Sequence, residues 1–324
     1  MRAVMCKAFG PPESLVIEEV EDPKPASGQV VVDIEACAVN FPDVLMIQDM
    51  YQFKPPLPFS PGAEVAGTVS AVGDGVDILD VGDRVIASPG WGGLAEKVAV
   101  DAQSAIQVPD GIDLVHASSF LYAYGTAHYA LKDRGQLKPG ETLLVLGAAG
   151  GVGLAAVELG AAMGANVIAA ASTDDKLELC REHGATMGIN YASEDLKTRI
   201  RELTGGVGAD VVYDPVGGAY SEPALRSTAW EGRFLVIGFA DGEIPRIPLN
   251  LALLKGCSIV GVFWGAFVGR ERQRHRENVA ELLDWWQEGR LHPHVSTTYP
   301  LERAGEAIRE LADRKAKGKV VVTI

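Results

Sequence analysis

The chain has 324 residues, 47% of them hydrophobic, which is enough to build a sizeable core and two globular domains. Its formal net charge is −14, and this acidity argues against a nucleic-acid partner, because phosphate backbones are bound by clustered cations. No apolar run approaches the ~18 residues needed to cross a bilayer, and no leader precedes the first predicted strand, so we expect no membrane association. The four cysteines lie far apart and form no C-x-x-C pair, so we expect a reducing, cytoplasmic setting.

The first 120 or so residues are predicted to be rich in β-structure. Short strand-like segments at residues 30–39, 64–73 and 83–88 are separated by Gly, Pro and Asp. Such spacing is typical of a compact barrel.

The pattern changes near Tyr122, after which apolar strands alternate with helices. Predicted strands lie at 142–147, 166–172, 210–214, 233–238 and 258–263, and predicted helices at 154–163, 174–183 and 193–203. Apolar strands joined by helical crossovers indicate a parallel sheet that is covered on both faces. We therefore predict a doubly wound α/β domain.

After the α/β segment, the strand–helix alternation ends, and the last residues are expected to join the first domain. A helix is predicted over residues 270–288, a second over 301–318, and a strand at 320–324. We expect both chain ends to form one domain, residues 1–122 with 265–324, around an inserted α/β domain at 123–264.

The segment "VLGAAGGVG" has the context of a dinucleotide-binding turn, since a buried strand precedes it and a helix follows it. In the pattern G-x-G-x-x-G, Ala148 takes the place of the first glycine. Gly150 would let the backbone approach a pyrophosphate, and Gly153 would let the helix pack against the strand. The cofactor is expected to contact the backbone of Ala149, Gly150, Gly151 and Val152.

The second strand of this unit ends without the carboxylate that NAD enzymes usually place there for the ribose 2′-hydroxyl. Ser172 stands in that position, Lys176 follows, and Tyr191 ends the next strand. A hydroxyl, an ammonium and a phenol suit a 2′-phosphate, which predicts NADPH rather than NADH. Asp174 and Asp175 either start the next helix, which we favour, or receive a ribose hydroxyl.

No set of Cys, His and acidic residues has the spacing of a metal site, and no G-x-S-x-G motif for a nucleophilic serine is present. Hydrolysis is therefore poorly supported. A nicotinamide that carries the chemistry itself fits the sequence better.

Four segments, "AVNFPDVLMIQDMYQ", "LPFSPGAEVAGTVSAVG", "GAAGGVG" and the closing "GKVVVTI", resemble the quinone oxidoreductase (zeta-crystallin-like) branch of the medium-chain dehydrogenase/reductase superfamily. They occur in the family's order and span essentially the whole chain. The resemblance implies a Rossmann domain inserted into a GroES-like catalytic β-barrel. It also implies metal-free catalysis, because Ala63 replaces a histidine ligand of the zinc-dependent relatives.

The resemblance places two catalytic residues and several cofactor contacts. Asn40 would orient the substrate or the nicotinamide ribose, and Tyr51 would donate a hydrogen bond or a proton; alternatively, Asn40 caps a turn and Tyr51 is a rim aromatic. The remaining contacts expected for the cofactor are Thr126, Val216, Gly238, Phe239, Phe263, Trp264 and Lys319.

The predicted function is a zinc-independent, NADPH-dependent reduction of quinones or similar activated carbonyl compounds. One alternative is an acryloyl-CoA or enoyl-CoA reductase, with Arg270, Arg272 and Arg274 near the CoA tail. Another is a non-catalytic, crystallin-like binding protein. The resemblance implies a homodimer paired through the strand in "KGCSIVGVF". The sequence leaves the physiological acceptor open, and also whether one or two electrons pass.

Overall fold

A computed structural model describes residues 1–324, which divide into two compact units. Unit 1 comprises residues 1–122 and 293–324, and unit 2 comprises residues 123–292. None of the helices combines the length and the apolar composition required to cross a bilayer.

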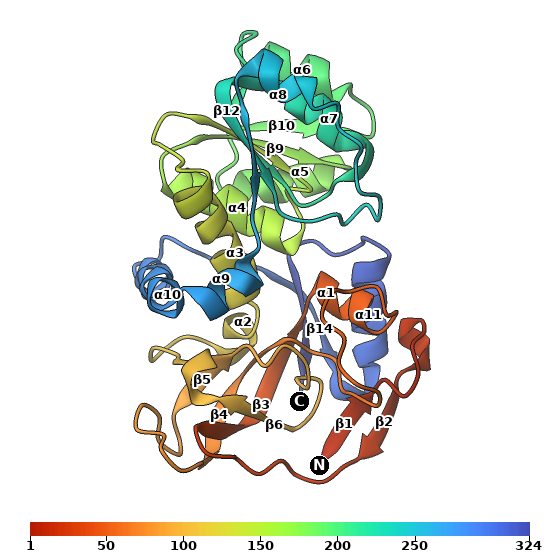
Figure 1. Ribbon diagram of the computed structural model, residues 1–324, viewed down its shortest axis with the longest axis vertical. Coiled ribbons are helices and arrows are strands. Elements are labelled where there is room, and N and C mark those ends of the chain that lie inside the picture. The colour runs from red at the N-terminus through yellow and green to blue at the C-terminus, as the bar shows by residue number, and fades with distance from the viewer. The chain divides into compact units, whose positions relative to one another are not determined.

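The main sheet of unit 1 has seven strands in the order β14-β15-β3-β4-β5-β7, with β6 paired to β3 (Figure 1). The long β3 pairs antiparallel with β4 on one side, and with β6 and then β15 on the other. The strand bounds are β3 Gln29–Val39, β4 Glu64–Val72, β5 Arg84–Ala87, β6 Lys97–Asp101, β7 Ala105–Gln107, β14 Val295–Pro300 and β15 Lys319–Thr323.

The apolar sequence at the end of β3 follows from burial on both faces of that strand. Cys37 and Val39 face the main core of the unit, while Ala36 and Ala38 face a second cluster with Val321. The remaining elements of unit 1 are β1 Arg2–Met5 paired with β2 Val16–Glu19, and helices α1 Phe41–Met46, α2 Leu114–Ala117 and α11 Ala304–Ala312.

Unit 2 contains a six-stranded parallel sheet in the order β10-β9-β8-β11-β12-β13. The strand order reverses between β8 and β11, which is the switch point where doubly wound sheets bind dinucleotides. The bounds are β8 Thr142–Leu146, β9 Asn166–Ala171, β10 Met187–Asn190, β11 Ala209–Asp214, β12 Thr228–Val236 and β13 Ser258–Gly261. Residues Leu143 to Leu146 of β8 are fully buried, as a central strand requires.

Four helices of unit 2, α4, α5, α6 and α10, lie near predicted positions, and α3, α7, α8 and α9 had not been predicted. They are α3 Thr126–His128, α4 Gly151–Ala162, α5 Asp174–Glu182, α6 Leu196–Leu203, α7 Gly218–Arg226, α8 Asn250–Lys255, α9 Trp264–Arg270 and α10 Arg272–Gln287. π-Helical turns flank α3 at Leu121–Gly125 and Tyr129–Arg134. The helix predicted over 301–318 is shorter than expected, since α11 ends at Ala312.

The compact units differ from the predicted domains at the second boundary: residues 265–292 lie in unit 2, whereas the sequence assigned them to the domain formed by the chain ends. Polar contacts hold α10 to the start of unit 2. Arg274 Nη2 and Asn278 Nδ2 donate to the two carboxylate oxygens of Asp133, at 2.5 and 2.8 Å. Glu281 binds Lys132 and accepts from His128 Nε2 at 3.1 Å. The helical period alone did not indicate which domain α10 would pack against.

Replacing Gly153 with alanine should destabilise the protein by about 1–3 kcal/mol, the usual cost of overpacking. A Cβ at this position would lie 2.2 Å from Gly147 O and 3.0 Å from Ala148 Cα, both backbone atoms. Gly269→Ala is the matched control, because that helical glycine has open space around its Cβ position. Urea unfolding measures both variants, and equal stabilities would contradict the close approach of α4 to its turn.

Candidate functional site

Asn40 lies where β3 ends and α1 begins, and the sequence "NFPD" sets up this junction. Asn40 precedes the first residue of α1, and its backbone N–H donates to Asp43 Oδ2 at 2.7 Å. The other oxygen of Asp43 accepts from Gly62 N at 3.0 Å. Asp43 therefore ties the start of α1 to the loop before β4, and it is wholly buried there.

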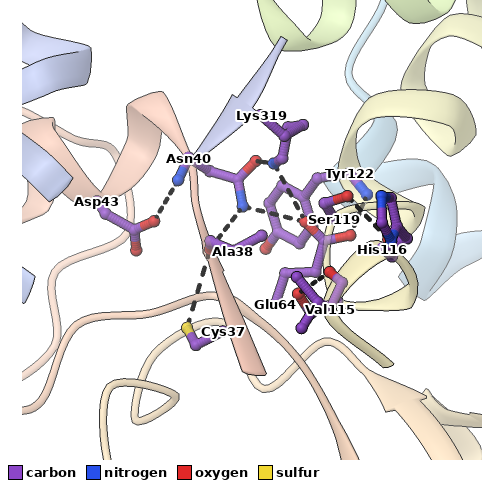
Figure 2. A network of polar contacts seen from close by, with 11 residues as sticks. Cys37, Ala38, Asn40, Asp43, Glu64, Val115, His116, Ser119, Tyr122 and Lys319 are labelled. Carbon is purple, nitrogen blue, oxygen red and sulfur yellow. Dashed lines mark hydrogen bonds and ion pairs between the residues drawn. The ribbon is translucent and has the colours of Figure 1, made fainter. Parts of the chain in front are cut away.

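A buried polar network surrounds the Asn40 side chain (Figure 2). Lys319 Nζ donates to Asn40 Oδ1 at 2.5 Å and pairs with Glu64 Oε2 at 3.4 Å. Asn40 Nδ2 donates to the same Glu64 oxygen at 3.2 Å and to Ala38 O at 3.3 Å. The remaining oxygen of Glu64 accepts from the backbone N–H of Tyr122 at 2.9 Å. This network brings together β3, β4 and β15.

Burial dominates the electrostatics of this network. It raises the pKa of Asp43 to about 6, although hydrogen bonds from Asn40 and Gly62 and the charge of Lys319 act in the opposite direction. Burial also raises the pKa of Glu64, against the lowering effect of Lys319. The Lys319 ammonium is paired with Glu64, whereas Asp43 has no direct ion pair, and hydrogen bonds satisfy both carboxyl groups.

The residues around this network do not fit a zinc ion. Ala63 occupies the place where the zinc-dependent relatives carry a ligand, and no group of three or more His, Cys, Asp or Glu side chains is arranged to hold a metal. Cys37 is fully buried, and its Sγ would lie 2.7 Å from a Cβ on Gly62 and 3.0 Å from one on Gly93. Burial raises the pKa of the Cys37 thiol well above its usual range, so it is a packed thiol.

Tyr51 packs at the edge of the unit 1 core, with its ring edge-on to Phe53 at a centroid distance of 5.8 Å. Burial and, secondarily, the charge of Asp43 raise the pKa of its hydroxyl, which holds it in the phenol form. Tyr51 therefore stays protonated, as a hydrogen-bond donor must. Its catalytic role stays a prediction.

In unit 2, the glycine-rich turn leaves backbone donors open. Gly147 adopts a left-handed φ of 57°, and Gly150 N donates to Gly147 O at 3.0 Å, which closes the turn before α4. The N–H groups of Ala149, Gly151 and Val152 make no hydrogen bond within the chain. No acidic residue lies in the first turn of α4. These donors and the helix N-terminus fit an anionic pyrophosphate.

The three residues predicted to bind a 2′-phosphate lie at the carboxyl ends of β9 and β10. Lys176 Nζ is 3.4 Å from Ser172 Oγ. Tyr191 N donates to Ala171 O at 3.1 Å, which places Tyr191 beside the residue before Ser172. Asp174 starts α5 and accepts from Asn190 Nδ2 at 2.8 Å, which agrees with the structural role favoured for it.

The other residues predicted to contact the cofactor fall into two groups. Val216, Gly238, Phe239 and Phe263 follow β11, β12 and β13, and Phe239 and Phe263 are 38% and 48% exposed, as a ligand-lining role requires. Trp264 is instead buried, and its indole lies 3.0 Å from a Cβ built on Gly125, next to Thr126. Lys319 lies in unit 1, within the network described above. No contact with a cofactor is tested for these residues, and their roles stay predictions.

Sequence reasoning missed three buried carboxylates that organise these sites. Asp43 and Glu64 hold the unit 1 network, and Asp214 holds the turn after β11 by accepting from Val216 N and Gly217 N, both at 2.9 Å. Asp43 and Asp214 each adjoin a proline, and Glu64 begins the apolar strand β4. Because acidic residues are ordinarily exposed and are buried only when paired, the acids at the ends of apolar strands were the available signal.

Two family profiles match the chain. Residues 26–110 match the alcohol dehydrogenase GroES-like domain, and residues 151–287 match the zinc-binding dehydrogenase profile. Together with the parallel sheet of unit 2, these matches confirm the predicted fold class. The zinc implied by the second description has no donor set in this chain, so no catalytic step is assigned to it.

Similar proteins cover the chain over its length. A quinone oxidoreductase-like protein 2 homolog of Nematostella vectensis is 41% identical over 99% of this chain and 88% of its own. A mycobacterial structure described as complexed with NADPH is 33% identical, with a TM-score of 0.94 and full coverage of both chains. An Escherichia coli quinone oxidoreductase complexed with NADPH is 29% identical, with a TM-score of 0.93 and full coverage of both chains.

The buried Asp43 predicts a pH dependence of stability. Because its pKa rises from 3.8 to about 6 on folding, the folded state holds the proton more tightly than the unfolded chain does. The contribution of this group to the free energy of unfolding should therefore fall by about 3 kcal/mol as the pH rises from about 4 to 6.

Urea unfolding of the wild type and of Asp43→Asn at several pH values measures this effect, since contributions of the other carboxyl groups cancel in the difference. We expect the stability advantage of the wild type to shrink between pH 4 and 6 and to level off above that window. A constant difference across the range would contradict the raised pKa.

Proposed function

This chain belongs to the quinone oxidoreductase-like, zinc-free branch of the medium-chain dehydrogenase/reductase superfamily, and from that premise we propose that it reduces quinones or other activated carbonyl and enone compounds with NADPH. The family makes the chain an NADPH-dependent oxidoreductase. The acceptor is the part that we propose.

The proposal is carried by two neighbouring features of unit 2. The glycine-rich turn after β8 offers backbone N–H donors to an anion, and a lysine lies near the carboxyl end of the adjacent strand β9. The free N–H groups of Ala149, Gly151 and Val152 suit a pyrophosphate. Ser172 and Lys176, 3.4 Å apart, suit a 2′-phosphate. NADPH held by these residues supplies the hydride.

The unit 1 site supports an acceptor that carries its own electron-withdrawing group. Without a metal to polarise a carbonyl, the chain must stabilise negative charge on the acceptor oxygen with its own donors. Tyr51, held as a phenol, is the proposed donor of a hydrogen bond or a proton to that oxygen. Asn40, fixed by Lys319 and Glu64, shapes the site beside it.

Enoyl-CoA reduction is the second candidate. Unit 2 has a cavity of about 540 Å³ whose lining includes Phe239, Phe263, Arg134 and Arg270, a combination that suits an amphiphilic anion. Arg274, however, is bound to Asp133 and Glu271. Of the three arginines expected near a CoA tail, Arg270 is the one that lines this cavity. A third candidate, a non-catalytic crystallin-like protein, has no supporting feature beyond the resemblance.

The homodimer stays part of the proposal. β13 pairs with β12 alone and forms one edge of the unit 2 sheet. Ile259 on this strand is 39% exposed, and nearby Leu253 and Leu254 are 81% and 68% exposed. An exposed edge strand with apolar neighbours is a surface that oligomers commonly cover.

Lys176→Ala should lower kcat/KM for NADPH at least tenfold and leave that for NADH nearly unchanged, because it removes a charge-assisted contact to the 2′-phosphate. Initial rates with both cofactors measure the effect. Arg181→Ala is the control, since this residue lies on the same helix and pairs with Glu178. Equal kcat/KM of the wild type with NADPH and NADH would contradict the phosphate assignment.

The acceptor is tested by NADPH consumption against a panel of quinones, enones and acyl-CoA enoates. We expect turnover with quinones or simple enones, and we expect Tyr51→Phe to lower kcat about 100-fold with little change in KM. Tyr299→Phe is the control, since that hydroxyl donates to Glu310 elsewhere in unit 1. Activity on acryloyl-CoA alone would replace the proposed acceptor, and no activity at all would favour the non-catalytic reading.

A further inference from the structure

The ammonium of Lys319 has a hydrogen-bond donor that the chain does not use. An ammonium carries three N–H donors. Figure 2 shows its two acceptors, Asn40 Oδ1 at 2.5 Å and Glu64 Oε2 at 3.4 Å, and these two bonds leave one N–H of the ammonium over. The side chain is 9% exposed, so it is largely but not wholly enclosed.

Asn40 cannot act as that donor toward a substrate, because its amide hydrogens are already committed. Both Nδ2 hydrogens have acceptors, Glu64 Oε2 at 3.2 Å and Ala38 O at 3.3 Å. Turning the amide over would place its NH₂ group against the ammonium and its oxygen against the Glu64 carboxylate, which is unfavourable on both sides. The network therefore fixes the amide orientation and leaves the ammonium as the open donor.

Glu64 makes a buried ammonium tenable at this position. An unpaired buried charge costs several kcal/mol, and a buried carboxylate with its other oxygen hydrogen-bonded offsets that cost. Glu64 is fully buried, and its second oxygen accepts from Tyr122 N at 2.9 Å. One oxygen of Glu64 is therefore fixed by the backbone of Tyr122, and the other pairs with Lys319. This pairing restricts the position of the Lys319 amine.

We propose that the third N–H of Lys319 is a second hydrogen-bond donor, additional to Tyr51, that stabilises the acceptor oxygen when this oxygen becomes negatively charged. The inference rests on the proposed reductase function. A hydride that leaves NADPH, which is oxidised to NADP+ as its C–H bond breaks, would form a C–H bond on the acceptor carbon, and the π pair would move to the conjugated oxygen. That oxygen develops a full negative charge and finally takes a proton, either from water or through Tyr51, which water then reprotonates. Lys319 keeps its own proton throughout and supplies a fixed positive charge.

This role differs from the cofactor contact that the resemblance implied for Lys319. A cofactor contact would govern the affinity for NADPH. An oxyanion donor would govern the affinity for an anionic oxygen in the acceptor site and the rate of turnover. The two roles are therefore separable by measurement.

A cofactor-free titration with 4-nitrophenol tests the proposal, because the phenolate of this probe is yellow and its phenol is colourless. We expect the wild type to bind the phenolate in preference to the phenol, so that the bound probe ionises at a lower pH than the free probe. Lys319→Met should weaken phenolate binding at least tenfold and remove the preference. Lys315→Met is the control, since this exposed lysine pairs with Asp313 outside the network.

Lys319→Met leaves the Glu64 carboxylate buried without a counter-charge, which destabilises the fold, so the double variant Lys319→Met/Glu64→Gln accompanies it. That variant removes both charges together and is expected to fold. It should also lose the preference for phenolate, and its kcat with a quinone should fall about 100-fold. Its affinity for NADPH, measured by fluorescence titration, should stay within about twofold of the wild type.

Two results would overturn the proposal. One is phenolate binding by the folded double variant that equals the wild type. The other is a tenfold loss of NADPH affinity with phenolate binding unchanged, which would make Lys319 a cofactor contact instead. Absence of turnover by the wild type with the whole acceptor panel would overturn the proposed function, and the phenolate titration would still report on Lys319 independently.

Discussion

The buried pairing of Lys319 with Glu64 is the contact that ties the last strand of unit 1 to its first strands. It joins residues that are 255 positions apart, and Asn40, a further partner of Lys319, is 279 positions away. The last strand of the chain thereby becomes part of a site built from the first strands of the same unit. A buried charge pair of this kind adds little stability beyond an apolar substitute, but it specifies where its partners must lie. Its value here is the fixed orientation of an amide and an ammonium.

In each unit, a buried carboxylate also accepts hydrogen bonds from residues at the unit's boundary, where the chain passes to the other unit. Glu64 accepts from the backbone of Tyr122, the last residue of the first segment of unit 1. In unit 2, Glu158 of α4 accepts from Tyr124 Oη at 2.5 Å and from His292 N at 2.8 Å. Glu158 therefore ties both ends of unit 2 to the helix that begins at the dinucleotide turn. Each of these acids is buried, and hydrogen-bond donors meet its oxygens, which is what burial of such a group requires.

The parallel sheet could be predicted in considerable detail from the sequence. The apolar runs of β8 and β9, the glycines at 147, 150, 151 and 153, and the serine after β9 are local signals with one dominant structural meaning. They predicted the turn, the helix and the clustering of Ser172 and Lys176, because carboxyl ends of parallel strands meet at one edge. By contrast, α10 lies in unit 2, whereas the sequence assigned it to the domain formed by the chain ends. Its amphipathic period predicts a buried face, but the partners of that face, Asp133 and His128, come from a distant stretch of chain.

The sequence by itself determined the fold class, the position of the dinucleotide turn and the family, because each depends on residue spacing along short segments. Only the tertiary structure decided that Asp43, Glu64 and Lys319 lie in one network, that Asn40 has no free amide hydrogen, and that Trp264 is buried beside Gly125. The physical reason is that burial and hydrogen-bond partners of a charged side chain are set by residues far away in sequence. A lysine five residues from the end of a chain is ordinarily solvated, and it becomes a buried donor only when β15 pairs with β3 beside Asn40.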